Sequence, residues 1–163
     1  MTRTPSPQLD LTAQARDALR AGARASRRRE RGGILVGYRT QTGLRIEDAL
    51  LVPDQTAART HYLRRAKDAA RVLNDYLDND LDPFVGYVGE WHTHPSPVPP
   101  SPTDRASMRL MSIRNKSPVA LIVAALESNH RDVQIYAMMS APDPLTHRLL
   151  GRHKDAAINL VTN

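Results

Sequence analysis

The strongest constraint on the fold of this chain is a proline-rich stretch, PSPVPPSP, which covers residues 95–102. Proline fixes φ and has no backbone N–H, so this stretch cannot lie inside a helix or a central strand and must be a loop. The segment before it, FVGYVGEWHTH, has the apolar, glycine-interrupted character of a strand. The segment after it predicts a short helix through Met111, which Asp104 could cap.

Helical and extended patterns alternate along the rest of the chain. Apolar residues and alanines recur at helical spacing from Leu11 to about Arg29 and over Tyr62–Leu77, and a last helix is predicted over Leu145–Leu160. Asp10 or Thr12 could cap the first helix. The predicted strands cover residues 34–38, 44–53, 84–94, 118–128 and 132–140. The last two form a hairpin, and the mixture predicts an α/β (α+β) domain.

Length and composition narrow the class of protein. A chain of 163 residues is typical of one domain, and we expect a flexible N-terminal tail over residues 1–10 and a single domain over residues 11–163. Because the chain has no cysteine, disulfides, thiolate metal ligands and cysteine nucleophiles are excluded. No apolar run approaches the ~20 residues of a membrane span, and no secretion signal is visible. We therefore expect a cytoplasmic protein without a membrane partner.

The positive charge is concentrated at the N-terminal end. The chain has a formal net charge of +6, of which residues 1–31 hold +5 through eight arginines and three carboxylates. A local cluster comprises Arg24, Arg27, Arg28, Arg29 and Arg31. It could be a docking patch for nucleic acid or an acidic protein, or simply a solvated helix face. No aromatic residue is interleaved for base stacking, so nucleic acid is not the expected partner.

The histidines before the proline-rich stretch predict a metal site. His92 and His94 alternate along a predicted strand, so both imidazoles leave the same face. Asp104 follows ten residues after His94, and the stiff loop can return it to the histidines. Two imidazoles and one carboxylate leave a fourth position open, which is typical of catalytic zinc. A bare H-x-H pattern is weak by itself, and here the loop and the aspartate give it specificity.

A catalytic metal site of this kind also needs a carboxylate that accepts a proton. Two glutamates qualify from the sequence. Glu90 lies two residues before His92 and shares its strand face, whereas Glu30 lies at the junction between the first predicted helix and the strand GGILVG. The spacing alone leaves both open.

The motifs together resemble those of the JAMM (MPN-plus) zinc metalloproteases. That family has a glutamate before a strand of small residues, then H-[ST]-H-P, then serine, two residues and aspartate. Here the pattern reads ERGGILVG from Glu30, HTHP from His92, and SPTD from Ser101 to Asp104. The resemblance covers roughly Leu11 to Ser140, and the form GEWHTHP is most similar to bacterial JAB-type members. The loop before the serine is one residue shorter than in many members.

The resemblance implies a role for each of these residues. His92, His94 and Asp104 would bind one Zn²⁺ per chain. Glu30 would be the general base that accepts a proton from the attacking water and passes it to the leaving amine. Ser101 would stabilise the oxyanion. The implied fold is a single JAB/MPN domain with a central mixed β-sheet flanked by helices, a layout similar to that of cytidine deaminases.

The resemblance also implies a function. Family members hydrolyse isopeptide or peptide bonds after the C-terminal glycine of ubiquitin or ubiquitin-like proteins, and bacterial relatives occur in antiphage systems such as CBASS. The expected partner is a ubiquitin-like or similarly conjugated protein with an extended C-terminal tail. Trp91 could form a wall of the substrate groove or pack in the core. Two alternatives stay open: a metal-free scaffold of the same fold, and a nucleic-acid-associated protein that uses the arginine cluster.

Overall fold

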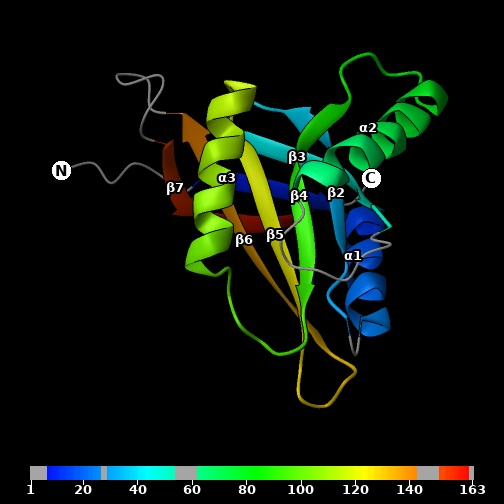
Figure 1. The fold of residues 1–163 in the computed structure, drawn as a ribbon, viewed down its shortest axis with the longest axis vertical. Helices are drawn as coiled ribbons and strands as arrows, with labels where there is room; N and C mark the ends of the chain where they lie inside the picture. Colours follow the sequence, from blue (N-terminus) through cyan, green and yellow to red (C-terminus); the bar gives the residue numbers. More distant parts are fainter. Residues whose placement is uncertain (1–6, 27–28, 54–61, 143–150, 162–163) are drawn as a thin grey trace.

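The computed structural model describes residues 7–26, 29–53, 62–142 and 151–161, which form one mixed sheet flanked by helices (Figure 1). Within these ranges, no helix combines the length and the apolar character needed to cross a membrane. In chain order the elements are β1 (Gln8–Thr12), α1 (Ala13–Ala25), β2 (Gly32–Arg39), β3 (Gly43–Leu51), α2 (Tyr62–Asn79), β4 (Gly86–His94), α3 (Pro102–Asn115), β5 (Val119–Leu126), β6 (Val133–Pro142), β7 (Gly151–Asp155) and β8 (Ala157–Val161).

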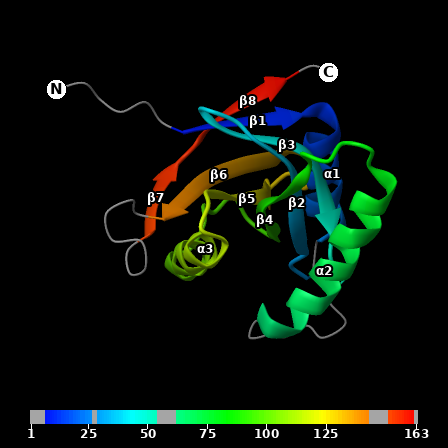
Figure 2. The same cartoon turned by 90° about the horizontal axis from the view of Figure 1, so that it is seen from above.

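The strands form one sheet in the order β7-β6-β5-β4-β2-β3-β1-β8. Pairing is antiparallel for β2 with β3 and β4 and for β6 with β5 and β7; β4 runs parallel to β5, and β1 runs parallel to β3 and β8. Only Ala156 separates β7 from β8, yet these strands occupy opposite ends of the order. The sheet therefore curls until its two ends are consecutive in the chain (Figure 2). The prediction of a mixed sheet flanked by helices is confirmed.

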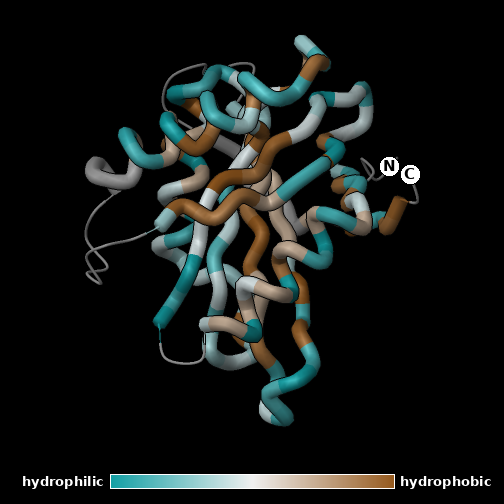
Figure 3. Tube along the Cα trace, turned by 90° about the vertical axis from the view of Figure 1, so that its right-hand side faces the viewer, coloured by the Kyte–Doolittle hydropathy of each residue, from teal (hydrophilic) through white to brown (hydrophobic). Residues whose placement is uncertain are grey.

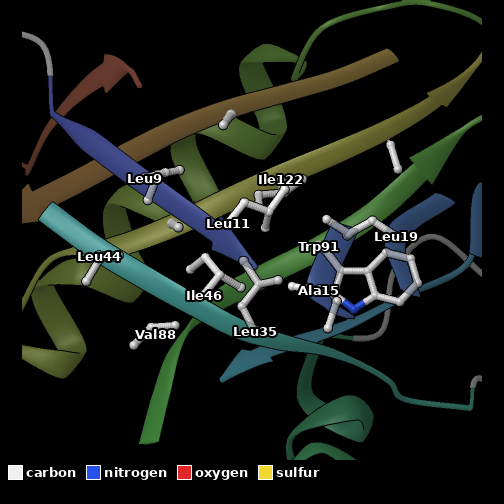
Figure 4. Packing of buried hydrophobic residues seen from close by; sticks show 14 of the residues in the cluster. Leu9, Leu11, Ala15, Leu19, Leu35, Leu44, Ile46, Val88, Trp91 and Ile122 are labelled. Atoms are coloured by element: carbon white, nitrogen blue, oxygen red, sulfur yellow. The ribbon is translucent and has the colours of Figure 1, made fainter. Parts of the chain in front are cut away.

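The main hydrophobic core lies on the inner face of this curled sheet, and α1 packs against it (Figure 4). The helix contributes Ala15, Leu19 and Ala23, all fully buried. Its start is fixed by Thr12, whose Oγ1 accepts a hydrogen bond of 3.2 Å from the Ala15 N–H. The strands contribute Leu9, Leu11, Leu35, Leu44, Ile46, Val88, Trp91 and Ile122.

The other two helices pack on the outer face of the sheet. Helix α2 covers β2 through contacts with Ile34 and Val36, and α3 covers β5 and β6 through Met108, Leu121 and Met138. Figure 3 shows the hydrophobic stretches passing through the middle of the molecule, with hydrophilic residues at the loop tips. Every residue of β5 is buried because this strand lies between the inner core and α3.

Two predictions about the chain ends are wrong. The predicted tail over residues 1–10 is too long, because Gln8–Thr12 forms β1, while residues 1–6 lie outside the described part. The predicted helix Leu145–Leu160 is replaced over residues 151–160 by β7 and β8, and residues 143–150 lie outside the described part. Pairing with the exposed edges of β6 and β1 satisfies backbone groups there, which outweighs the local helical pattern.

Gly22 on α1 allows the helix to contact the ring of Trp91, and we expect Gly22→Ala to destabilise the protein. An added methyl carbon would lie 2.6 Å from Cη2 of Trp91. Overpacking costs roughly 1–3 kcal/mol, more than the ~1 kcal/mol that alanine gains in helix propensity. The free energy of unfolding in urea should fall by about 1 kcal/mol. In a Trp91→Leu background, Gly22→Ala should not destabilise the protein, because the indole ring that the methyl group would meet is gone. If Gly22→Ala stabilised the wild-type protein, the close contact between Gly22 and Trp91 would be contradicted.

The Tyr38 hydroxyl donates a hydrogen bond of 2.7 Å to Asp82 Oδ2. This bond, then desolvation and the charges of nearby carboxylates, raises the pKa of Tyr38 to about 12. Because the folded pKa is the higher one, the stabilisation is complete below a pH of about 10 and is lost as the pH rises towards 12. The difference in phenolate absorbance between wild type and Tyr38→Phe should show this late titration, and Asp82→Asn should move it towards 10. A wild-type Tyr38 that titrates near 10 would contradict the bond.

Candidate metal centre

Strand β4 places both histidines on the outer face of the sheet, as their spacing predicts. Trp91 and Thr93 alternate with them and are buried on the inner face. The Nε2 atoms of His92 and His94 are 3.1 Å apart. The side chain of His92 is 18% exposed, so the two rings are partly sheltered and still accessible from solvent.

The start of α3 brings Asp104 to the histidines. Its Oδ2 lies 3.6 Å from Nε2 of His92, and its side chain is 24% exposed. The helix begins with a capping box in which Ser101 is the N-cap and Asp104 is the third helical residue. Oγ of Ser101 accepts a hydrogen bond from the Asp104 N–H, and the N–H and Oγ of Ser101 each donate to Asp104 Oδ2 at 2.7 Å. The prediction that Asp104 is the N-cap is therefore wrong, because Ser101 holds that position.

These contacts determine the ionisation of Asp104. Burial of the carboxyl raises its pKa, but the nearby His92 imidazole and the hydrogen bonds accepted from Ser101 outweigh burial and hold the pKa well below its usual range. The carboxylate is therefore charged at neutral pH. Its place in the first turn of α3 adds the favourable field of the helix N-terminus.

A backbone carbonyl in the proline-rich loop fixes the orientation of His94. Nδ1 of His94 lies 2.8 Å from the Val98 carbonyl oxygen, which can only accept, so Nδ1 carries the proton and Nε2 keeps its lone pair. The same loop is anchored by Tyr136 on β6, whose hydroxyl donates to the Pro97 carbonyl at 3.0 Å. Neither contact could be predicted from residue types, because both acceptors are backbone oxygens.

The three side chains fit a metal ion. One ligand atom from each of His92, His94 and Asp104 lies within 4.8 Å of the other two. Ligands ~2.0–2.1 Å from a tetrahedral ion are roughly 3.3 Å apart, close to the separation of the two Nε2 atoms. Two imidazole nitrogens and one carboxylate are a donor set that suits zinc and related transition metals, and they leave a position for a further ligand.

Both candidate glutamates lie on the face of the histidines. Gly32 pairs with His92, and the Thr93 N–H donates to the Arg31 carbonyl at 2.8 Å. Continuing this register places Glu30 opposite His94, with an exposed side chain. Glu90 lies nearer the middle of β4. The pKa of Tyr87 is raised there, first by burial of the Tyr87 hydroxyl and then by the negative charge of Glu90. Glu90 therefore lies within the outer face of β4, whereas Glu30 lies just before the paired part of β2.

A groove of about 410 Å³ lies between α2 and α3; Glu90 lines it, but His92, His94 and Asp104 do not. Its walls are mainly apolar, with Glu90 and Arg114 as charged residues. Trp91 does not line it; the indole is 3% exposed, faces the inner core and donates from Nε1 to the Leu50 carbonyl. The interpretation of Trp91 as a wall of the substrate groove is therefore wrong, and core packing is correct. Apolar residues that line the groove include Ile34, Ala69, Leu73 and Met111.

The arginine cluster is only partly within the described residues. Arg27 and Arg28 lie outside them, whereas Arg29 and Arg31 are exposed and the Arg24 Nε donates to the Arg131 carbonyl at 3.1 Å. Arg24 therefore links the end of α1 to the β5–β6 hairpin. The two interpretations of the cluster, docking patch or solvated face, stay predictions.

Comparison with known proteins agrees with this geometry. No curated protein matches the chain. A protein from Desulfitobacterium hafniense with a known solution structure is similar in fold, with a TM-score of 0.67 and 17% identity over 95% of this chain and 94% of that one. Residues 12–138 match the family described as prokaryotic homologs of the JAB domain. Since that match spans most of the sequence, the chain belongs to this family of prokaryotic JAB-domain homologs.

Proposed function

We propose that this protein is a zinc-dependent hydrolase that cleaves a peptide or isopeptide bond after the extended C-terminal tail of a ubiquitin-like or similarly conjugated protein. The observation that carries the proposal is the convergence of His92, His94 and Asp104 from a strand end and a helix start. Membership of the JAB-domain homologs supports it, because hydrolases are common in that family. Bacterial conjugation systems, including antiphage ones, would supply such substrates.

The residues of the cluster would divide the work between them. His92, His94 and Asp104 would hold zinc, which activates water and polarises the scissile carbonyl when it is bound. Glu30 would accept a proton from the attacking water and deliver it to the leaving nitrogen, so that the C–N bond breaks as a carboxylate and an amine form. The Ser101 hydroxyl now donates to Asp104, and its freely rotating proton could turn to the oxyanion.

The groove between α2 and α3 suits the acyl side of such a substrate. It is mainly apolar, and its lining includes Glu90, two residues from His92. An extended tail with small or aliphatic side chains could occupy it without a change in the sheet. Glycine at the end of the tail would allow the closest approach to the cluster, because it has no side chain.

Metal content and the two glutamates provide the first test. Purified wild type should contain near one zinc per chain by plasma mass spectrometry, and His92→Ala should contain almost none. Glu30→Gln should keep the metal but lower kcat by about 10²–10⁴-fold on a fluorogenic conjugate in which a ubiquitin-like C-terminal glycine is linked to lysine. Glu90→Gln is the matched control and should keep most of kcat.

The outcomes separate the open alternatives. Loss of kcat in Glu90→Gln with full activity in Glu30→Gln would reverse the assignment of the base. Zinc at the cluster without hydrolysis of any conjugate would reject the hydrolase. No zinc in any variant after expression with added metal would favour the metal-free scaffold.

The anchor of the proline-rich loop provides a second test. Tyr136→Phe removes the hydrogen bond to the Pro97 carbonyl and should loosen the loop that orients His94. A lost hydrogen bond of about 0.5–1.5 kcal/mol corresponds to zinc affinity that is weaker by roughly twofold to tenfold. Competition with a chelating dye would measure it, with Tyr76→Phe on α2 as the control. Unchanged affinity in Tyr136→Phe would show that the anchor does not act on the metal site.

A further inference from the structure

The loop between α2 and β4 exposes two large apolar side chains. Leu81 is 98% exposed and Phe84 is 82% exposed, the highest values among the large hydrophobic residues of the described chain. Single exposed apolar residues are common on protein surfaces, but two within four positions form a local patch. We call residues 80–85 the Leu81–Phe84 loop.

Hydrogen bonds hold this loop in one shape. Oδ1 of Asp82 accepts from the Phe84 N–H at 2.9 Å, and its carbonyl accepts from the Val85 N–H at 3.3 Å. The Asp82 N–H donates to Oδ1 of Asp80 at 2.9 Å, while Tyr38 ties Oδ2 of Asp82 to β2. The two apolar side chains are thus presented by an ordered turn, and a partner would not have to order the loop when it binds.

Acidic residues surround the patch. Residues 72–104 contain no lysine or arginine, although the chain as a whole has a net charge of +6. The last turn of α2 has no basic residue, and carboxylates there oppose the helix dipole. This charge pattern does not serve the stability of the helix. The carboxylates on or next to the loop belong to Asp75, Asp78, Asp80 and Asp82.

We propose that the Leu81–Phe84 loop docks a protein whose own apolar patch is bordered by lysine and arginine. The exposed leucine and phenylalanine would fill the apolar part, and the four aspartates would pair with the basic border. Nucleic acid does not fit an acidic surface, because its phosphates would be repelled. The lack of lysine and arginine over residues 72–104 likewise argues against an acidic partner.

A second copy of this chain fits less well. Its basic residues concentrate in and after α1, and an apolar patch there would be needed to receive Leu81 and Phe84. Among the described residues, none of the exposed large apolar side chains lies on α1. The arginines in and next to α1 could attract the aspartates of another copy, but no exposed large apolar side chain among the described residues accompanies them there. Leu110 is exposed beside Arg114 on α3, and the oligomeric state of the wild type decides whether that surface receives the loop.

The position of the loop connects it to the metal centre. Figure 1 shows the loop before β4 and the proline-rich loop after β4 at opposite ends of that strand. Val85 precedes His92 by seven residues, or about 23 Å of extended chain. A partner docked on the loop could reach His92 with an extended tail of about the same length as residues 85–92. Only this link between the loop and the metal cluster rests on the proposed function.

Binding of defined peptides tests the docking surface independently of hydrolysis. The probes are two synthetic amphipathic helices with the same leucine face, one flanked by lysine and the other by glutamate. In fluorescence anisotropy at low salt, the lysine peptide should bind wild type at least tenfold more tightly than the glutamate peptide, and added salt should weaken it. A Leu81→Ser/Phe84→Ser variant should bind the lysine peptide at least tenfold more weakly than wild type does. Because both side chains are exposed, this variant should fold normally.

Matched variants and the oligomeric state decide the result. Leu110→Ser removes another exposed leucine, on α3, and should bind the lysine peptide as wild type does. Equal binding of both peptides, or of wild type and Leu81→Ser/Phe84→Ser, would overturn the proposal. The proposal would also be overturned if light scattering showed that wild type is a dimer and that the Leu81→Ser/Phe84→Ser variant is a monomer, because the loop would then bind a second copy. Failure of hydrolysis with intact peptide binding would reject only the proposed function.

Discussion

The pairing of β2 with β4 is the constraint on which the candidate metal centre depends. Gly32 lies opposite His92 and Gly33 opposite Trp91, and a methyl carbon at Gly32 would lie 2.6 Å from the Trp91 carbonyl. Gly32 therefore allows the two strands to meet in this register, whereas Gly33 allows the close approach of β3. A slip of one residue would turn the histidines into the core and the indole into solvent. One pairing therefore positions a candidate metal ligand, His92, and a core residue, Trp91, together.

The proline-rich loop converts this strand end into a three-sided site. It leaves β4 at His94 and enters α3 at Ser101, where Asp104 has two tasks. The carboxylate completes the capping box of the helix, and the same Oδ2 faces His92. Both tasks favour the charged form, because helix N-termini and imidazoles both stabilise an anion. Helix capping and metal binding therefore both call for the same charged carboxylate.

Periodicity was sufficient to predict the parts of the site that depend on local geometry. Alternation placed His92 and His94 on one face, and proline stiffness returned Asp104 to them. Longer-range effects were not visible in the sequence. The pattern around Leu160 is compatible with a helix, and only the free edge of β1 makes it a strand. The side of the sheet that Trp91 faces depends on α1, and the Val98 carbonyl that orients His94 leaves no trace in residue types.

Strand β4 separates stability from chemistry across the thickness of one sheet. Its inner face, with Val88 and Trp91, belongs to the core that α1 completes, whereas its outer face carries Glu90 and both histidines. Substitutions on the inner face should therefore change the free energy of unfolding before they change metal binding, and those on the outer face should do the reverse. The same separation explains why the exposed loop before β4 can carry apolar side chains without cost to the core. Its shape is fixed by Asp82 and Tyr38, outside the inner core.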